Sequence, residues 1–369
     1  MNQHGQRSKP TASRPSAFRN ATLTKASGDD GTSVLGFSRA YSISLCPQLI
    51  YTRSNLLPAL VSSKVHAQLE FLAVGSWWIF SNDTGGSREE GQLDKLRRIP
   101  GGREDIFSDK SIDLRSSRSL MKFLKIAADA ETHDTILEEW GSRPFPDYLN
   151  AQFNIVPALQ APLLALTSSP STPAMTLTSF ALPRIHRHLT SIGLFGPGFG
   201  AVLPKWGGLA EIAQVACRAG AVGGGVYVLN KGIESVEDKN TPPRLGEEVS
   251  DAEEQCSLRI KLQGGEEINA HWLVGSSDDI HPFTEQPPTQ LETSQTSHSI
   301  TIVSSPLPSL FRLPAEGAPS PAATVVVFPI GSLSFDSPIA AVDIPPVYLT
   351  IHSSDTGECP TGQCESPPS

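Results

Sequence analysis

The chain has 369 residues, of which 38% are hydrophobic, and it carries a net charge of −9 at pH 7. This length and composition are sufficient for a sizeable buried core and favour two or three domains. The acidic balance argues against a nucleic-acid backbone as the main partner. Five cysteines are too few for a disulfide framework, which favours a reducing compartment.

The first 34 residues are polar, rich in Ser, Thr, Lys and Arg, and without apolar periodicity. They are predicted to form a disordered tail, because they bury too little apolar surface to offset the entropy of ordering. The tail lacks the apolar centre of a secretory signal, although its Arg- and Ser-rich composition leaves a transit peptide open. No apolar run reaches the length of a transmembrane helix. We expect a cytoplasmic protein.

From residue 35 the pattern becomes that of a folded domain. Residues 39–53 alternate like a strand, residues 55–71 carry apolar side chains at helical spacing, and residues 69–80 return to strand-like composition. In the segment 115–131, one face of a predicted helix is apolar. This face comprises Leu120, Phe123, Leu124 and Ala127. Further helical patterns continue to residue 190, so the middle third is predicted to be helical.

The last third is predicted to be rich in strands. Residues 257–275 contain two short β runs about a Gly-Gly pair, which indicates a hairpin. Residues 278–298 are rich in Pro, Thr, Gln and Ser and are predicted to be a loop. Further strands are predicted within 299–307, 323–331 and 346–354. The final residues are expected to be frayed.

Residues 204–233, PKWGGLAEIAQVACRAGAVGGGVYVLNKGI, form the most organised stretch of the chain. On a helical wheel one side is apolar and comprises Leu209, Ile212, Ala213, Ala216 and Cys217. The opposite side carries Glu211, Gln214 and Arg218. One interpretation is a helix packed on a sheet, with a solvated polar face. Glycines 223–225 suit a left-handed cap and a tight turn into a strand at VYVL.

Upstream, GPGFGA at 196–201 formally satisfies the spacing of a dinucleotide-binding loop. Such a loop should follow a strand and open a helix whose N-terminus faces the pyrophosphate. Pro204 follows three residues later, which does not favour that context. The order of glycines, helix, strand and hairpin nevertheless resembles the core of flavin-dependent oxidases, so an FAD-dependent oxidoreductase is the alternative function.

Several blocks in the same order resemble the Rab escort protein and GDP-dissociation-inhibitor family. SIGLFGPGFGAVLPKWGGLAEIAQVACRAGAVGGGVYVLNKGI is similar to its most distinctive segment. RAYSISLCPQLIY, VHAQLEFLAVGSWWIF and RSLMKFL are similar to three further blocks, and together the blocks cover about residues 35–354. The residues in these blocks are most similar to those of fungal Rab escort proteins, component A of Rab geranylgeranyltransferase.

The resemblance implies an α/β (α+β) flavoprotein-like fold without flavin, with a mixed-sheet domain I and a helical domain II. Domain I would comprise 35–98 and 195–355, domain II 99–194, and disordered tails 1–34 and 356–369. The family's N-terminal dinucleotide-type βαβ start is expected to be missing. The resemblance also implies a non-catalytic, cofactor-free protein that presents GDP-bound Rab GTPases to the geranylgeranyltransferase α and β subunits and shields the attached geranylgeranyl lipid. Delivery of Rab implies transient membrane association.

The resemblance implies a Rab-binding surface made by the polar helix face and its neighbours. Its residues are Arg39, Glu211, Gln214, Arg218, Val226 and Val228. The alternative for Glu211 and Arg218 is an ordinary surface pair that contributes little. A lipid groove in domain II would use Leu120, Phe123 and Leu124, for which ordinary core packing is the alternative.

Phe145, in RPFPDYL, is a candidate contact with the transferase. Two further motifs contain residue types that bind metals. His186 and His188 are two apart in RIHRHL, where a solvated basic helix face is the competing interpretation. Cys359 and Cys364 form a C-x4-C pair for which His352 is the one obvious further ligand. Neither motif offers a full ligand set, and no metal site is predicted.

Overall fold

In a computed structural model of the protein, the described residues are 20–24, 35–45, 47–81, 95–100, 112–238, 258–275, 296–313, 316–333 and 344–366. The expected tail 1–34 and loop 278–298 lie almost wholly outside these ranges. Across the described residues, no helix has the length and apolar character needed to cross a bilayer.

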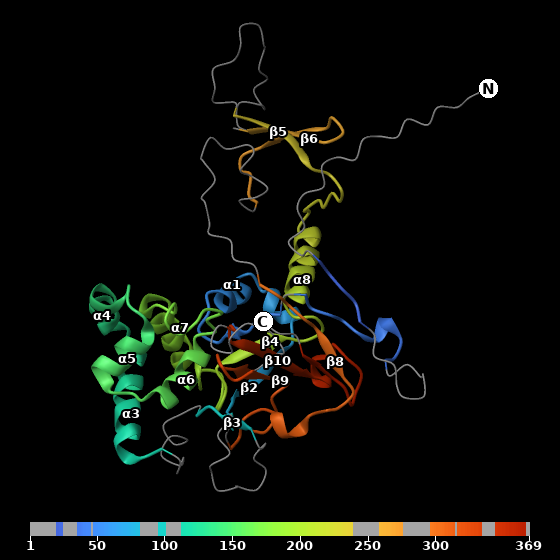
Figure 1. Cartoon of the computed structure of the whole chain (residues 1–369). Helices are drawn as coiled ribbons and strands as arrows, with labels where there is room; N and C mark the ends of the chain where they lie inside the picture. Colours follow the sequence, from blue (N-terminus) through green and yellow to red (C-terminus); the bar gives the residue numbers. More distant parts are fainter. Residues whose placement is uncertain are drawn as a thin grey trace, which may run out of the picture.

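An eight-stranded mixed sheet forms the centre of the structure (Figure 1). Its strands are β1 (Ile50–Tyr51), β2 (Phe71–Phe80), β3 (Leu96–Arg98), β4 (Ala201–Pro204), β8 (Thr301–Val303), β9 (Ala323–Phe328), β10 (Val347–Ser353) and β11 (Cys364–Ser366). The order is β1-β4-β2-β9-β10-β11-β8, with β3 paired to β2 beside this path. The pair β2 and β9 is parallel and the remaining pairs are antiparallel.

The central strands β2 and β9 are buried on both faces, as their continuous apolar sequences FLAVGSWWIF and ATVVVF predict. Successive side chains point to opposite faces, so Val325 and Val327 pack against the helical layer while Val326 packs with Trp78 and Ile351 on the other side. Both the predicted strand at 69–80 and that at 323–331 are confirmed.

A helical layer packs on one side of this sheet (Figure 1). It comprises α3 (Leu114–Ala128), α4 (His133–Trp140), α5 (Phe145–Phe153), α6 (Pro157–Leu166) and α7 (Thr178–Ser191), with the 3-10 turn η3 (Ala130–Thr132). Asp113 begins α3 by accepting hydrogen bonds from the backbone N–H groups of Arg115 and Ser116. The prediction of a helical middle third is confirmed.

The opposite face of the sheet carries α1 (Leu56–Ser62), the 3-10 turn η2 (Val65–Gln68) and the first part of α8 (Leu209–Val222). Further 3-10 turns are η1 (Ser38–Ala40), η5 (Pro308–Leu310) and η7 (Ser354–Thr356). The predicted helix over 55–71 is therefore two shorter pieces, and its C-terminal part already belongs to β2.

A separate antiparallel sheet contains β5 (Ile233–Asp238), β6 (Leu258–Leu262) and β7 (Glu267–Ala270). β6 and β7 form the predicted hairpin, and Gly264 and Gly265 at its turn both have positive φ angles. Figure 1 shows α8 rising from the main sheet towards this smaller sheet.

The segments 41–44 and 356–369 differ from the predictions of local structure. Residues 41–44 have no strand partner, because the chain here is held by 3-10 turn η1 and by contacts with residues 206 and 358. The expected disordered tail 356–369 is ordered at least to Ser366. Its strand β11 joins β10 to β8, and Cys359 and Cys364 are buried.

Candidate functional site

Helix α8 begins in a tight turn that brings it against the segment 36–44. Gly208, the residue that caps α8, has φ +63° and ψ −135°, a conformation that favours glycine. The preceding Gly207 also has a positive φ angle, and a Cβ there would lie 3.2 Å from Ser42 Oγ. Ser42 Oγ in turn donates a hydrogen bond to the Trp206 carbonyl. The glycines of the Trp-Gly-Gly motif thus permit close approach of two backbone segments.

Only the first half of α8 packs against the protein. Leu209, Ile212 and Val215 contact the apolar residues of α1 and η2, and Val215 is the one fully buried residue of the helix. The expected apolar stripe is wrong in its second half, because Ala213, Ala216 and Cys217 are exposed. The helix extends past the edge of the core. Among the described residues, those at 216–222 are exposed apart from Gly220, which lies against Tyr227.

The three glycines after α8 reverse the chain direction. Gly224 has φ +92°, which confirms the predicted left-handed residue, and Gly225 donates a backbone hydrogen bond to the Gly220 carbonyl. The Tyr227 hydroxyl lies against Gly220, where a Cβ would collide with it. The chain therefore folds back on the end of the helix.

The predicted strand at VYVL is not formed. Residues 225–228 have no regular secondary structure and no ladder partner. Val222, Val226 and Leu229 are 85%, 86% and 83% exposed, values that leave almost the whole of each side chain in solvent. Together with Val228, they form an apolar tip at the end of α8.

The predicted polar residues of α8 lie N-terminal to this apolar tip on the same helix, and Arg39 lies on η1. Gln214 and Arg218 are exposed, and Glu211 in the first turn is half-buried. Arg39 lies on η1, is exposed, and places its guanidinium 5.6 Å from the centre of the Phe37 ring. The structure therefore presents Gln214 and Arg218 to solvent on the same helix as the apolar tip, with Arg39 on a separate segment.

A C-terminal segment holds the Arg39 segment and the start of α8 in one body. The backbone N–H of Ser42 donates to the Glu358 carbonyl, and the backbone N–H of Trp206 donates to the Thr356 carbonyl. Beneath these contacts, Glu358 is buried and its carboxylate lies 2.5 Å from His352 Nδ1. The sequence gives no sign of this pair, because its pattern predicts a disordered tail over residues 356–369.

Trp206 and Gly357 complete this junction. Trp206 has φ +72° and its ring lies against Gly357, whose own φ angle is +77°. The ammonium group of Lys205 lies 4.9 Å from the centre of the Trp206 ring and also pairs with Glu70 at 3.0 Å. A tryptophan directly before two glycines is the one signal in the sequence that pointed to this close packing.

The GPGFGA segment does not open a helix. Gly196 and Gly198 have positive φ angles, and the segment runs directly into β4. The helix N-terminus that a pyrophosphate requires is therefore missing from this turn, in agreement with the interpretation that it is not a dinucleotide-binding loop.

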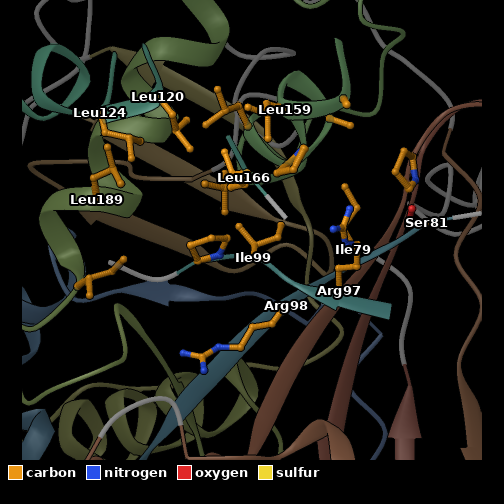
Figure 2. Close-up of a pocket in the computed structure, with 18 of the residues that line it drawn as sticks. Ile79, Ser81, Arg97, Arg98, Ile99, Leu120, Leu124, Leu159, Leu166 and Leu189 are labelled. Atoms are coloured by element: carbon orange, nitrogen blue, oxygen red, sulfur yellow. The ribbon is translucent and has the colours of Figure 1, made fainter. Parts of the chain in front are cut away.

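A cavity of about 370 Å³ lies between the helical layer and the end of β2 and β3. Figure 2 shows its apolar side chains gathered from several elements. They include Leu120 and Leu124 of α3, Leu159, Leu163 and Leu166 of α6, Leu189 of α7, and Ile79 and Ile99. Among the described residues, its charged lining residues are Arg97, Arg98 and Lys125, and none of the lining residues is acidic. We call this cavity the apolar pocket.

Two of the three predicted groove residues line the apolar pocket. Leu120 is buried and Leu124 is half-buried at its wall. Phe123 is not part of it, because its ring is fully buried and packs against Phe145 and Phe153 at centroid distances of 5.9 and 5.5 Å. Phe145 is also fully buried. The ring of Phe145 therefore has no exposed surface in this structure, and its contact with the transferase stays a prediction.

The histidines of RIHRHL do not form a metal site. His186 Nδ1 lies 3.1 Å from the Ala127 carbonyl, whereas the His188 ring packs edge-on against Tyr51 and Trp77. Burial lowers the pKa of His188 to about 4 and raises the pKa of Tyr51 to about 12. The expected solvated face is thus wrong for His188. Within the described ranges, no group of three or more His, Cys, Asp or Glu residues is placed to hold a metal ion.

A family model described as GDP dissociation inhibitor matches residues 21–258. The chain belongs to the GDP dissociation inhibitor family. Among its curated relatives, Rab proteins geranylgeranyltransferase component A of Saccharomyces cerevisiae is 31% identical over 198 residues, which are 54% of this chain and 31% of the relative. The chain thus matches about a third of the length of this relative.

Solved structures agree with the family fold. The Rab GDI of Plasmodium falciparum aligns with a TM-score of 0.58 and 17% identity, covering 92% of this chain and 69% of that protein. An oxidoreductase from Methanosarcina mazei aligns with a TM-score of 0.50 and 10% identity, covering 91% of this chain and 71% of that protein. The mixed sheet with a helical layer is therefore the α/β fold of the GDP dissociation inhibitor family, and it is shared with an oxidoreductase.

Proposed function

We propose that this protein binds Rab GTPases in their GDP-bound form and acts as the non-catalytic escort component of Rab geranylgeranylation. Its partners would be the Rab protein, the α and β subunits of the transferase, and the geranylgeranyl lipid on the Rab. Membership of the GDP dissociation inhibitor family and the similarity to component A proteins support the proposal.

The observation that carries the proposal is the uncovered second half of α8. It combines the charged Arg218 with an apolar tip at Val222, Val226 and Leu229, and a monomer gains nothing by exposing such a patch. Docking of a folded partner would bury both parts. A charge that becomes buried and hydrogen-bonded at an interface costs about 2 to 5 kcal/mol when truncated, whereas a solvated one costs little.

The apolar pocket is the site that we assign to the geranylgeranyl chain. Its volume of about 370 Å³ falls in the range of small-ligand sites, and its wall includes Leu120 and Leu124. Each CH₂ group of a sequestered chain contributes about 0.8 kcal/mol, so a C20 lipid repays even partial burial.

A pull-down with a GDP-loaded Rab protein tests the proposal. We expect wild-type protein to bind, and Glu211→Ala and Arg218→Ala each to weaken binding about 30-fold or more, because each would leave an interfacial charge unpaired. Lys261→Ala is the matched control. Lys261 lies on β6, outside α8, and its ammonium group pairs with the Glu234 carboxylate at 3.2 Å. Wild-type protein that fails to bind, or equal losses in all three variants, would refute the assignment of this surface.

Escort activity is separated from simple recycling by a prenylation assay. Addition of the protein to the transferase α and β subunits with an unmodified Rab should allow geranylgeranyl transfer. Neither the protein alone nor the subunits alone should modify the Rab. Transfer that proceeds equally without the protein would leave only the inhibitor role.

An FAD-dependent oxidoreductase is the second candidate, and the shared fold with an oxidoreductase favours it. The turn at GPGFGA argues against it, because it leads into β4 and not into a helix. Purified protein that carries stoichiometric flavin absorbance would support the oxidoreductase and overturn the escort proposal. We further propose that the protein is cytoplasmic and meets membranes transiently when a Rab is delivered.

A further inference from the structure

Helix α3 presents a row of four cations to solvent. The row consists of Arg115, Arg118, Lys122 and Lys125, and all four are exposed. Their spacing of three, four and three residues places them within an arc of about 80° on the helix, over a length of about 15 Å. We call this row the α3 basic stripe. The apolar face of α3 points in nearly the opposite direction.

Within helix α3 itself, no acidic residue balances the stripe. The 15 residues of α3 contain neither Asp nor Glu. Carboxylates lie at its ends, where Asp113 caps its first turn and Asp129 accepts a hydrogen bond from the Glu131 backbone. In the part of the chain that the structure describes, none of the four cations forms an ion pair. The ammonium group of Lys122 lies 5.7 Å from the centre of the Phe153 ring.

The stripe is unusual for this chain, which has 38 acidic and 29 basic residues. Four cations without an acid on one helix face are therefore a local reversal of the overall charge. Such a reversal attracts an anionic partner by Coulomb forces over about one Debye length.

The neighbourhood of the stripe favours lipid over an acidic protein as that partner. Lys125 belongs both to the stripe and to the lining of the apolar pocket, and the adjacent Leu124 lines the same pocket. At the other end of α3, Leu114 is 75% exposed. Cations that flank exposed and pocket-lining leucines on one helix match the interface of a bilayer, where charge contacts headgroups and apolar groups contact acyl chains.

We propose that the α3 basic stripe contacts the anionic headgroups of a membrane, so that the apolar pocket opens towards the bilayer at Lys125. The proposal shares with the proposed function only the idea of transient membrane contact. It requires no Rab protein. Membrane binding can therefore be refuted while Rab binding is confirmed, and Rab binding can be refuted while membrane binding is confirmed.

Co-sedimentation with vesicles tests the proposal on the full chain. Vesicles of phosphatidylcholine alone are compared with vesicles that contain about one third phosphatidylserine. We expect binding to the anionic vesicles only, and a steep loss of that binding as salt is raised. Absence of binding to the anionic vesicles at low salt would overturn the proposal and leave the stripe to an acidic protein partner.

Two double variants locate the surface. Arg115→Gln with Arg118→Gln, and Lys122→Gln with Lys125→Gln, keep good helix formers and should each weaken binding about 25-fold, at about fivefold per charge. Arg115 and Arg118 are exposed, so the first pair remains a valid test if loss of the contact between Lys122 and Phe153 destabilises the second.

The matched control changes the net charge equally at another place. Lys231→Gln with Lys261→Gln removes two partly exposed cations, one just before the small sheet and one on its strand β6, where they pair with Glu266 and Glu234. This control should retain vesicle binding, and all variants should retain Rab in the pull-down. Equal loss in the control and the stripe variants would overturn the assignment to α3, because only net charge would then matter.

Discussion

The neighbouring residues Phe123 and Leu124 should respond to alanine substitution in opposite ways. Phe123 is fully buried among Phe145 and Phe153, so Phe123→Ala leaves a cavity in the helical layer and should cost about 3 to 5 kcal/mol of unfolding free energy. Leu124 is half-buried at the wall of the apolar pocket. Its truncation to Ala removes three carbons, which lose about half of the burial that a fully buried leucine would lose. At about 0.8 kcal/mol per buried carbon, Leu124→Ala should cost about 1 kcal/mol.

Two assays separate the two residues. Urea unfolding followed by circular dichroism gives the stability of each variant, and a fluorescent geranylgeranyl-cysteine probe gives its lipid affinity. Leu124→Ala should be nearly as stable as wild type yet bind the probe less tightly. Phe123→Ala should lose stability while the protein that remains folded binds the probe nearly normally. The reasoning would be refuted if Leu124→Ala were the more destabilised variant, or if only Phe123→Ala lost the probe.

Three further predictions concern the core and the C-terminal junction. Burial lowers the pKa of His188 from 6.5 to about 4, so between these pH values the unfolded chain binds more protons than the folded one. The free energy of unfolding should therefore fall by about 3 kcal/mol as the pH drops through this window. Urea titrations at several pH values measure this fall, and His188→Gln should flatten it. Glu358→Ala should cost about 1 to 3 kcal/mol by leaving the ring nitrogen of His352 buried without its hydrogen-bond partner, and Glu358→Gln should cost less in the same unfolding assay. Gly357→Ala should lower the midpoint of thermal unfolding by the equivalent of at least about 1 kcal/mol, because alanine is strained at φ +77° and its Cβ would meet the Trp206 ring; an unchanged midpoint would contradict this packing.

Much of the fold could be predicted from local patterns. The strands β2 and β9 follow from continuous apolar runs, and the hairpin of β6 and β7 follows from two β runs around Gly264 and Gly265. Helix α3 and its apolar face follow from helical spacing. In each case the information lies within about ten consecutive residues, because the period of the side chains is itself local.

The wrong strand predictions share one cause: a sequence pattern favours a strand but does not show whether a neighbouring strand is present to pair with it. Residues 41–44 alternate, and residues 226–229 are rich in β-branched side chains, yet neither segment forms a strand. A strand requires a neighbouring backbone to pair with, and here the first segment bonds to residues 206 and 358 while the second stands in solvent. The reverse happens at Cys364–Ser366, which lies within a Gly- and Pro-containing tail and nevertheless pairs between β10 and β8.

The sequence by itself determined the class of fold, the amphipathic helices, the family blocks and the charged face of α8. Tertiary structure alone decided the use of individual side chains, since it buried Phe123 and Phe145, exposed Leu124 to the apolar pocket, and left the end of α8 uncovered. The physical reason is that helical or strand periodicity depends on neighbours in sequence, whereas burial depends on which distant elements pack above a residue. Buried pairs such as His352 and Glu358 become visible only when those elements meet.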